Sequence, residues 1–138
     1  MMVGKERTSV WVFAMAGMML VGAPILVGAD NESEPLEMIK KAVSEKKAIL
    51  VDVREKEEWN DGHLEDAKSL PLSLLRKGVN QEELSKQLPK DKVIYCHCAA
   101  GRRTPAAAKI LKQHGYDVRP LKSGYDALVE FGFATAPK

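Results

Sequence analysis

The sequence predicts an α/β layer fold, with a mainly parallel sheet flanked by helices. The main observation is alternation, because short apolar segments rich in branched residues are followed by segments whose apolar side chains recur at helical spacing. The second observation is length, since 138 residues suffice for one compact domain with a core but not for two. Composition agrees with this class, because 45% of the residues are hydrophobic and 29% are charged.

The first half of the predicted domain begins with a helix and a buried strand. Leu36, Ile39 and Val43 recur at helical spacing and predict the helix. Residues 48–53 are short, apolar and rich in branched side chains, which is typical of a strand buried on both faces. The other expected elements of this half are a helical turn at 55–60, a brief strand near 68–70 and a helix at 81–88.

The second half predicts a strand, a loop and a well-formed helix in direct succession. Residues 93–97 form the expected strand, and the loop follows at once. Thr104 and Pro105 occupy the preferred N-cap and N1 places of the helix, which Gly115 ends. The remaining elements of this half are a strand at 118–121 and a terminal helix at 125–131.

The first 29 residues differ from the rest and predict export. Lys5 and Arg7 precede an uncharged run over residues 10–29, and charges return at Asp30. A basic segment, an apolar stretch and small residues at the end are typical of a secretory signal peptide, here cleaved after Ala29. The alternative is an uncleaved membrane anchor, since about 20 apolar residues span a bilayer. Both interpretations place the domain outside the cytoplasm, in the periplasm or the extracellular space, and only the anchor brings it to a membrane.

Charge and cysteine usage exclude several classes of function. The formal net charge is +2, which gives no electrostatic argument for a nucleic-acid partner. The two cysteines, Cys96 and Cys98, are separated by one residue and do not form a disulfide framework. The three histidines lack the paired spacing of a zinc site, so we expect no metal and no cofactor.

The loop over residues 98–103 is the stretch that predicts chemistry. A loop between a strand and a helix directs several backbone N–H groups to one point, and the helix dipole adds positive potential there. Cys98 at the start of this loop should ionise more readily than a free thiol and act as a nucleophile. Arg102 and Arg103 would attract an anionic substrate. The alternative interpretation makes Cys98 a small buried residue and the arginines a solvated helix start.

The loop resembles the active-site loop of a known family. Residues 98–104, with the sequence C-A-A-G-R-R-T, are similar to the C-x-x-G-x-R-S/T loop of single-domain rhodanese-like sulfurtransferases. Residues 51–55 resemble the D-V-R-E segment of that family, and residues 57–67 resemble its E-E-W/F…G-H-I…A stretch. Residues 121–125 resemble the L-K-G-G segment, with Ser123 where the family usually has glycine. Several motifs in the correct order make the resemblance specific over most of the chain.

The resemblance implies a fold and a reaction. The fold would be the three-layer rhodanese-like fold, with about five strands in its central sheet. It would occupy residues 35–135, after a linker at 30–34 and before a tail at 136–138. Cys98 would take a sulfane sulfur from thiosulfate or a similar small anion, form a persulfide and pass the sulfur to a thiophilic acceptor such as cyanide. The oligomeric state is left open by the sequence.

The resemblance also implies a set of site residues around Cys98. Backbone N–H groups of the loop would cradle the persulfide charge. Arg102 and Arg103 are both candidates for holding the donor anion, and one of them could equally be tied to an acidic group. The implied substrate-binding residues are Ala99, Ala100, Gly101, Arg102, Arg103 and Thr104. Asp52, Arg54 and His63 would support the site, and their residue types at a strand end favour a structural role over a catalytic one.

Two other functions remain open at this point. Counted from Cys96, the segment to Arg102 has the C-x5-R spacing of cysteine phosphatases and arsenate reductases. That register places the nucleophile inside the strand at 93–97, where N–H groups belong to the sheet and cannot converge on an anion. We therefore expect Cys96 to be a buried strand residue. The second alternative is a rhodanese-like module that binds partners or carries sulfur without turnover.

Overall fold

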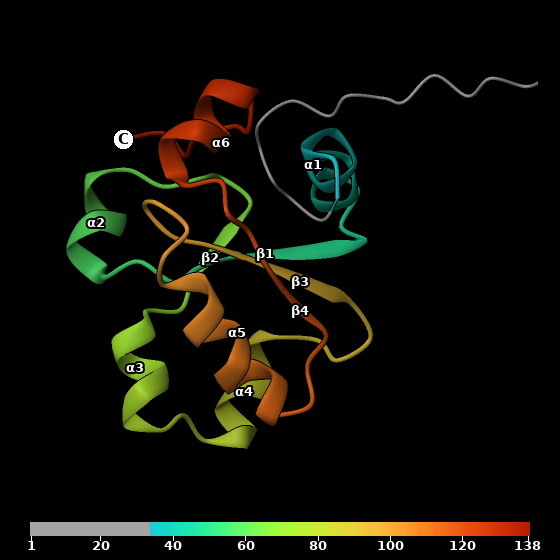
Figure 1. Ribbon diagram of the computed structural model, residues 1–138, viewed down its shortest axis with the longest axis vertical. Helices are drawn as coiled ribbons and strands as arrows, with labels where there is room; N and C mark the ends of the chain where they lie inside the picture. Colours follow the sequence, from blue (N-terminus) through green and yellow to red (C-terminus); the bar gives the residue numbers. More distant parts are fainter. Residues whose placement is uncertain (1–33) are drawn as a thin grey trace, which may run out of the picture.

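The computed structural model describes residues 34–138, which fold around a parallel four-stranded sheet (Figure 1). The strands lie in the order β2-β1-β3-β4. Their bounds are β1 (Ala48–Asp52), β2 (Ala67–Ser69), β3 (Val93–His97) and β4 (Val118–Pro120). All three strand pairs are parallel, so the predicted α/β class is confirmed.

Helices cover both faces of the sheet and give the molecule three layers (Figure 1). One face carries α1 (Leu36–Ser44) and α6 (Tyr125–Phe131). The other carries α3 (Leu72–Lys77), α4 (Gln81–Gln87) and α5 (Thr104–Gln113). The short helix α2 (Lys56–Asp61) follows the end of β1 and lies beside the loop between β3 and α5.

The two faces of β3 have separate hydrophobic cores, because successive side chains of a strand point in opposite directions. Cys96 and Cys98 belong to the core shared with α3, α4 and α5. Tyr95 belongs to the core shared with α1 and α6, and His97 lies on that same face two residues further on. Cys98 and its neighbour His97 therefore project to opposite sides of the sheet.

The described residues form four strands, where the resemblance implied about five. Besides these strands, the described residues contain an isolated antiparallel bridge between Leu64 and Thr135. The strand count is close to the expected one, and the topology of the sheet is unaffected.

Two helix assignments differ from the sequence prediction. Helix α3 was not predicted, although Leu72 and Leu75 are both buried at i, i+3 spacing and Gly78 follows the helix. The N-cap of α5 is Arg103, not Thr104, because Arg103 already has helical backbone angles (φ −86°, ψ −21°). The chain thus enters the helix one residue earlier than expected.

The predicted signal peptide, its cleavage after Ala29 and most of the predicted linker at 30–34 lie outside the described residues. Between Glu34 and Lys138 the structure has no helix that is long and apolar enough to cross a membrane.

Candidate active site

The site is built on the loop that leaves the carboxyl end of β3 and enters the amino end of α5. Cys98 follows the strand directly, and its side chain is only 1% exposed. Ala99, Ala100 and Arg102 of the same loop are exposed. A turn of this kind at a helix amino terminus favours a negative charge, because N–H groups without helical partners face it. The loop can therefore stabilise a thiolate or the charge of a bound anion.

A second segment of the chain, residues 121–125, holds this loop in place. Gly101 has φ +75°, and a Cβ added there would lie 2.3 Å from the carbonyl oxygen of Lys122. A Cβ on Gly124 would lie 1.8 Å from the carbonyl oxygen of Ala99. The Tyr125 N–H donates a 2.9 Å hydrogen bond to the Cys98 carbonyl. Backbone packs directly on backbone here, which leaves no room for a side chain at either glycine.

Ser123 stands where the family usually has glycine, and the neighbouring Gly124 makes the close backbone approach to the loop. Among the non-glycine residues at positions 34–138, only Lys46 has a positive φ, so the backbone at Ser123 suits any residue. Ser123 is buried and Gly124 makes the close approach to Ala99. The substitution at 123 therefore leaves the brace intact. Sequence reasoning did not place Gly124 in the site, although its position in the L-K-G-G segment was a signal.

The two arginines of the loop have different surroundings. Arg103 donates to both carboxylate oxygens of Glu58 on α2, at 2.7 and 2.8 Å. This hydrogen-bonded pair lowers the pKa of Glu58 to about 2 and raises the pKa of Arg103. Glu58 also accepts the backbone N–H of Glu55 at the start of α2. Arg103 thus ties the loop to α2, whereas Arg102 is exposed.

Thr104 is buried, and its hydroxyl serves the scaffold. The Thr104 Oγ1 lies 2.9 Å from the Leu121 carbonyl and 3.2 Å from the Gly101 carbonyl, so its single proton is directed to main-chain oxygens. These contacts join α5 to the loop and to the segment after β4. The side chain of Thr104 is therefore committed to the scaffold, and only its backbone N–H is available to the loop.

Asp52 and Arg54 form a buried ion pair at the carboxyl end of β1. Arg54 donates its backbone N–H, Nε and Nη2 to the carboxylate of Asp52 at 2.7 to 3.0 Å, and both side chains are nearly inaccessible. Nη2 also donates to the Gly62 carbonyl at 2.8 Å. The guanidinium carbon lies 4.1 Å from the ring centroid of Tyr125. The pair connects β1, the end of α2 and the start of α6, beneath the loop.

His63 lies at the end of α2, where it stacks on Trp59. The two ring centroids are 3.7 Å apart with an interplanar angle of 6°, and Nδ1 of His63 lies 3.1 Å from the Trp59 carbonyl. The His63 carbonyl accepts the N–H of Ala136. These contacts attach the last residues of the chain to α2 and do not involve the loop.

His97 is a buried residue near the site that sequence reasoning did not select. Its side chain is inaccessible, and neither ring nitrogen has a hydrogen-bond partner. Nε2 lies 3.8 Å from Oδ2 of Asp52, and the ring centroid is 6.5 Å from that of Tyr125. Burial lowers the pKa of His97, against the opposing effect of Asp52. The signal in the sequence was a histidine in the last position of an apolar strand.

Cys96 lies within β3 and is fully buried. Its Sγ is 3.7 Å from the Thr104 carbonyl, and burial raises the pKa of the thiol to about 12. The neutral thiol is a weak nucleophile. The expected buried strand position of Cys96 is confirmed, and the C-x5-R register has no anion-binding loop at its cysteine.

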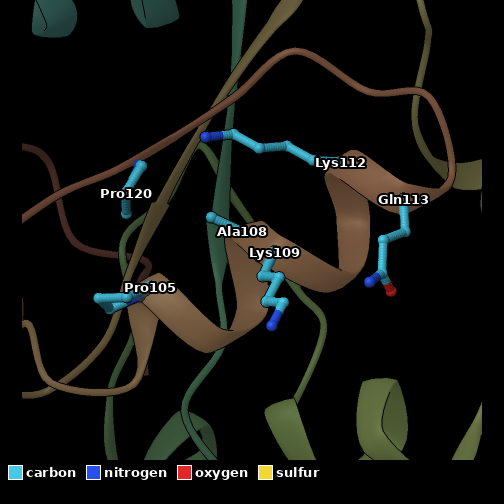
Figure 2. A pocket seen from close by; sticks show the side chains of 6 residues that line it. All are labelled: Pro105, Ala108, Lys109, Lys112, Gln113 and Pro120. Atoms are coloured by element: carbon cyan, nitrogen blue, oxygen red, sulfur yellow. The ribbon is translucent and has the colours of Figure 1, made fainter.

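Two clefts on the surface of residues 34–138 are not lined by Cys98. One cleft lies along α5, where Figure 2 shows Lys112 extending from the helix toward Pro120 of β4 and Lys109 pointing the other way. Another lies between α2 and α3 and includes Trp59 and Leu74. Cys98 lines neither cleft, so the chemistry is assigned from the loop geometry and not from concavity. Within residues 34–138 no group of three or more His, Cys, Asp or Glu side chains could hold a metal ion.

Comparison with known proteins identifies the family of this chain. The family model of the rhodanese-like domain matches residues 36–130, which is more than half of the chain. The chain therefore belongs to the rhodanese-like domain family. The match includes the loop at 98–104 and the segment at 121–125 that braces it.

Sequence identity and structural superposition with individual proteins measure this similarity. A protein named sulfurtransferase from Allochromatium vinosum is 28% identical over 103 residues, covering 74% of this chain and 91% of that protein. The protein YqhL of Bacillus subtilis is 35% identical over 81 residues, covering 58% of this chain and 60% of that protein. The crystal structure of a rhodanese-related protein from Thermoplasma volcanium superposes with a TM-score of 0.62 at 26% identity, covering 78% of this chain and 99% of that one.

Several relatives are longer than the shared domain. The matches span 60% of YqhL and only 22% of the longer protein MoeZ of Mycobacterium tuberculosis. Family membership supports a rhodanese-type sulfurtransferase in general terms, and it leaves the donor and the acceptor of sulfur undefined.

Proposed function

We propose that this protein is a sulfurtransferase that carries a sulfane sulfur as a persulfide on Cys98. The observation that carries the proposal is the position of Cys98, at the start of a braced loop that opens α5, in a chain of the rhodanese-like family. The sulfurtransferase of Allochromatium vinosum supports the same reaction class.

The first half-reaction loads the cysteine. The Cys98 thiolate attacks the outer sulfur of thiosulfate, the sulfur–sulfur bond of thiosulfate breaks and sulfite leaves with the electron pair. The product is a Cys98 persulfide, whose terminal sulfur carries the negative charge. Backbone N–H groups of residues 99–104 and the exposed Arg102 would stabilise the charge of the donor and of the persulfide. Arg103 is engaged with Glu58 and would act on the loop as a tether.

The second half-reaction unloads the cysteine onto a thiophilic nucleophile. Cyanide, the simplest acceptor, attacks the terminal sulfur, thiocyanate leaves and the Cys98 thiolate is restored. No metal or cofactor is required, because each step is a displacement at sulfur. The export expected from residues 1–29 is part of the proposal and would place this exchange in the periplasm or outside the cell.

The test is the thiosulfate:cyanide assay on three proteins: wild type, Cys98→Ser and Cys96→Ser. We expect Cys98→Ser to fall to background, since serine cannot hold a persulfide, and Cys96→Ser to retain most of the activity of wild type. Cys96→Ser is the matched control, because it makes the same atomic change two residues away in the buried strand. If Cys98→Ser keeps full activity and Cys96→Ser loses it, the proposal is wrong and Cys96 is the nucleophile.

Mass spectrometry separates turnover from binding. After treatment with thiosulfate, wild type should gain the mass of one sulfur atom, and cyanide should remove it. An adduct that cyanide does not remove would favour a sulfur carrier with another acceptor. The absence of any adduct would favour a rhodanese-like module that only binds partners.

A further inference from the structure

His97 is an orphaned polar side chain beside the nucleophile, and its surroundings explain why. Oδ2 of the Asp52 carboxylate lies 3.8 Å from Nε2, beyond hydrogen-bond distance. Arg54 already makes four hydrogen bonds to that carboxylate, two to each oxygen. An ionised carboxylate offers about four lone-pair sites, so Asp52 has no free site for the imidazole. The imidazole is therefore packed against a saturated ion pair.

The same ion pair is connected to Cys98 through Tyr125. Arg54 stacks on the Tyr125 ring at 4.1 Å, and the Tyr125 N–H donates to the Cys98 carbonyl at 2.9 Å. His97 itself is bonded to Cys98 through the chain, and its carbonyl accepts the N–H of Val53. The charged and titratable groups that face the imidazole are Asp52 and Arg54 from the end of β1 and Tyr125 from α6.

We propose that His97 is a positioning residue for Cys98. While the imidazole of His97 is neutral, the Asp52–Arg54 pair stays closed and Tyr125 stays packed against the loop. Protonation of the imidazole removes this arrangement. A proton taken from solvent would turn Nε2 into a charged donor that competes with Arg54 for Oδ2 of Asp52. Two cations would then share one buried carboxylate. Because a buried charge without full compensation is costly, the Arg54 contacts would open and the stack on Tyr125 would loosen.

The inference rests on the proposed function for its kinetic readout, but it has a second readout that needs no sulfur chemistry. Burial lowers the pKa of His97 from its usual 6.5, so the neutral form is present at neutral pH and is lost on acidification. A side chain that only filled space would give no such dependence. The geometry thus predicts that activity falls in acid as His97 becomes protonated.

The experiment compares wild type with His97→Gln, which retains a polar side chain that does not titrate. Activity is measured between about pH 5 and pH 8, the range in which a histidine charge changes. We expect wild type to lose roughly tenfold in kcat, relative to His97→Gln, for each pH unit below the pKa of His97, with little change in KM. The ratio cancels the ionisation of Cys98, which both proteins share. His114→Gln is the control, because His114 bonds to Gln81 away from the loop and should follow the profile of wild type.

Nuclear magnetic resonance on the wild-type protein provides the second readout. The imidazole signals of His97 and the backbone amide signal of Tyr125 should shift together with acid, at one midpoint below 6.5. Different midpoints, or a His97→Gln profile that superposes on that of wild type, would overturn the inference. If neither protein transfers sulfur, the proposed function fails, and the shared midpoint still decides the role of His97.

Discussion

Gly124→Ala tests whether the brace formed by residues 121–125 sets the geometry of the loop that begins at Cys98. Gly124 has ordinary backbone angles (φ −84°, ψ 179°), so alanine introduces no conformational strain of its own. The new Cβ would lie 1.8 Å from the Ala99 carbonyl oxygen, 2.5 Å from its carbonyl carbon and 3.0 Å from the Ala100 nitrogen. All three atoms belong to the backbone of the loop, so no side chain can move aside.

The size of the effect follows from the displacement that the methyl group requires. A Cβ contact below 3.0 Å is essentially never observed, so the loop and the brace must separate by at least 1.2 Å. Overpacking of this kind costs about 1–3 kcal/mol of stability. A displacement of about 1 Å at a reacting group costs roughly 10²-fold in rate. We therefore expect kcat/KM for thiosulfate to fall about 10²-fold in a protein that still folds.

The assay is the thiosulfate:cyanide rate beside thermal unfolding, with Gly78→Ala as the control. Gly78 ends α3 with φ +98° and has nothing within 4 Å of an added Cβ, so alanine there is strained but meets no neighbour. The control should lose stability by about 1 kcal/mol and keep its activity per folded molecule. Gly124→Ala with the activity and stability of wild type would refute the argument that backbone contact between Gly124 and Ala99 positions the loop.

Two further substitutions test the ion pairs around the site. Arg54→Met leaves Asp52 buried without its partner and should lower the free energy of unfolding by about 3–5 kcal/mol, measured by denaturant titration. Adding Asp52→Asn to Arg54→Met should recover part of that loss. If the double variant recovers no stability, an unpaired charge on Asp52 does not explain the loss. Glu58→Gln should change stability at neutral pH by less than about 1 kcal/mol, because the pair with Arg103 is about one-third exposed. The pKa of Glu58 is lowered to about 2, so its contribution is present above about 4.5 and declines as the pH falls toward 2. The unfolding free energies of wild type and Glu58→Gln should therefore converge in acid, and a constant difference between them would show that the pair is not responsible.

The elements with strong local signals could be predicted from the sequence. The apolar run that forms β1 and the strand-to-loop-to-helix succession around Cys98 both have patterns that arise within a few residues. Helix α3 was missed because it has only six residues and buries two leucines, which is too short for periodicity to stand out. Arg103 is the N-cap although its side chain makes no capping hydrogen bond and is paired with Glu58, and a rule of capping propensity does not predict this.

The site residues divide in the same way. Cys98 and its loop follow from local motif and spacing, whereas the brace at Gly124 depends on two segments meeting across the sheet. His97 was not predicted as a site residue, because the feature that distinguishes it is the absence of hydrogen-bond partners for its ring nitrogens. Its nitrogens are unpartnered only since Arg54 saturates Asp52, and that saturation is a fact of side-chain geometry. No property of the histidine in the sequence carries that information.

The arginines of the loop show how the fold assigns roles to identical residues. Arg102 and Arg103 are adjacent, and the sequence offers no means to tell which would meet an anion. The amino end of α2 places Glu58 where Arg103 can satisfy both of its oxygens, and the capping of α2 holds the same carboxylate from the other side. The two hydrogen bonds to Glu58 fix the guanidinium of Arg103 toward α2. Arg102, four residues after Cys98, is exposed and is the arginine of this loop that we expect to meet the donor anion in the proposed reaction.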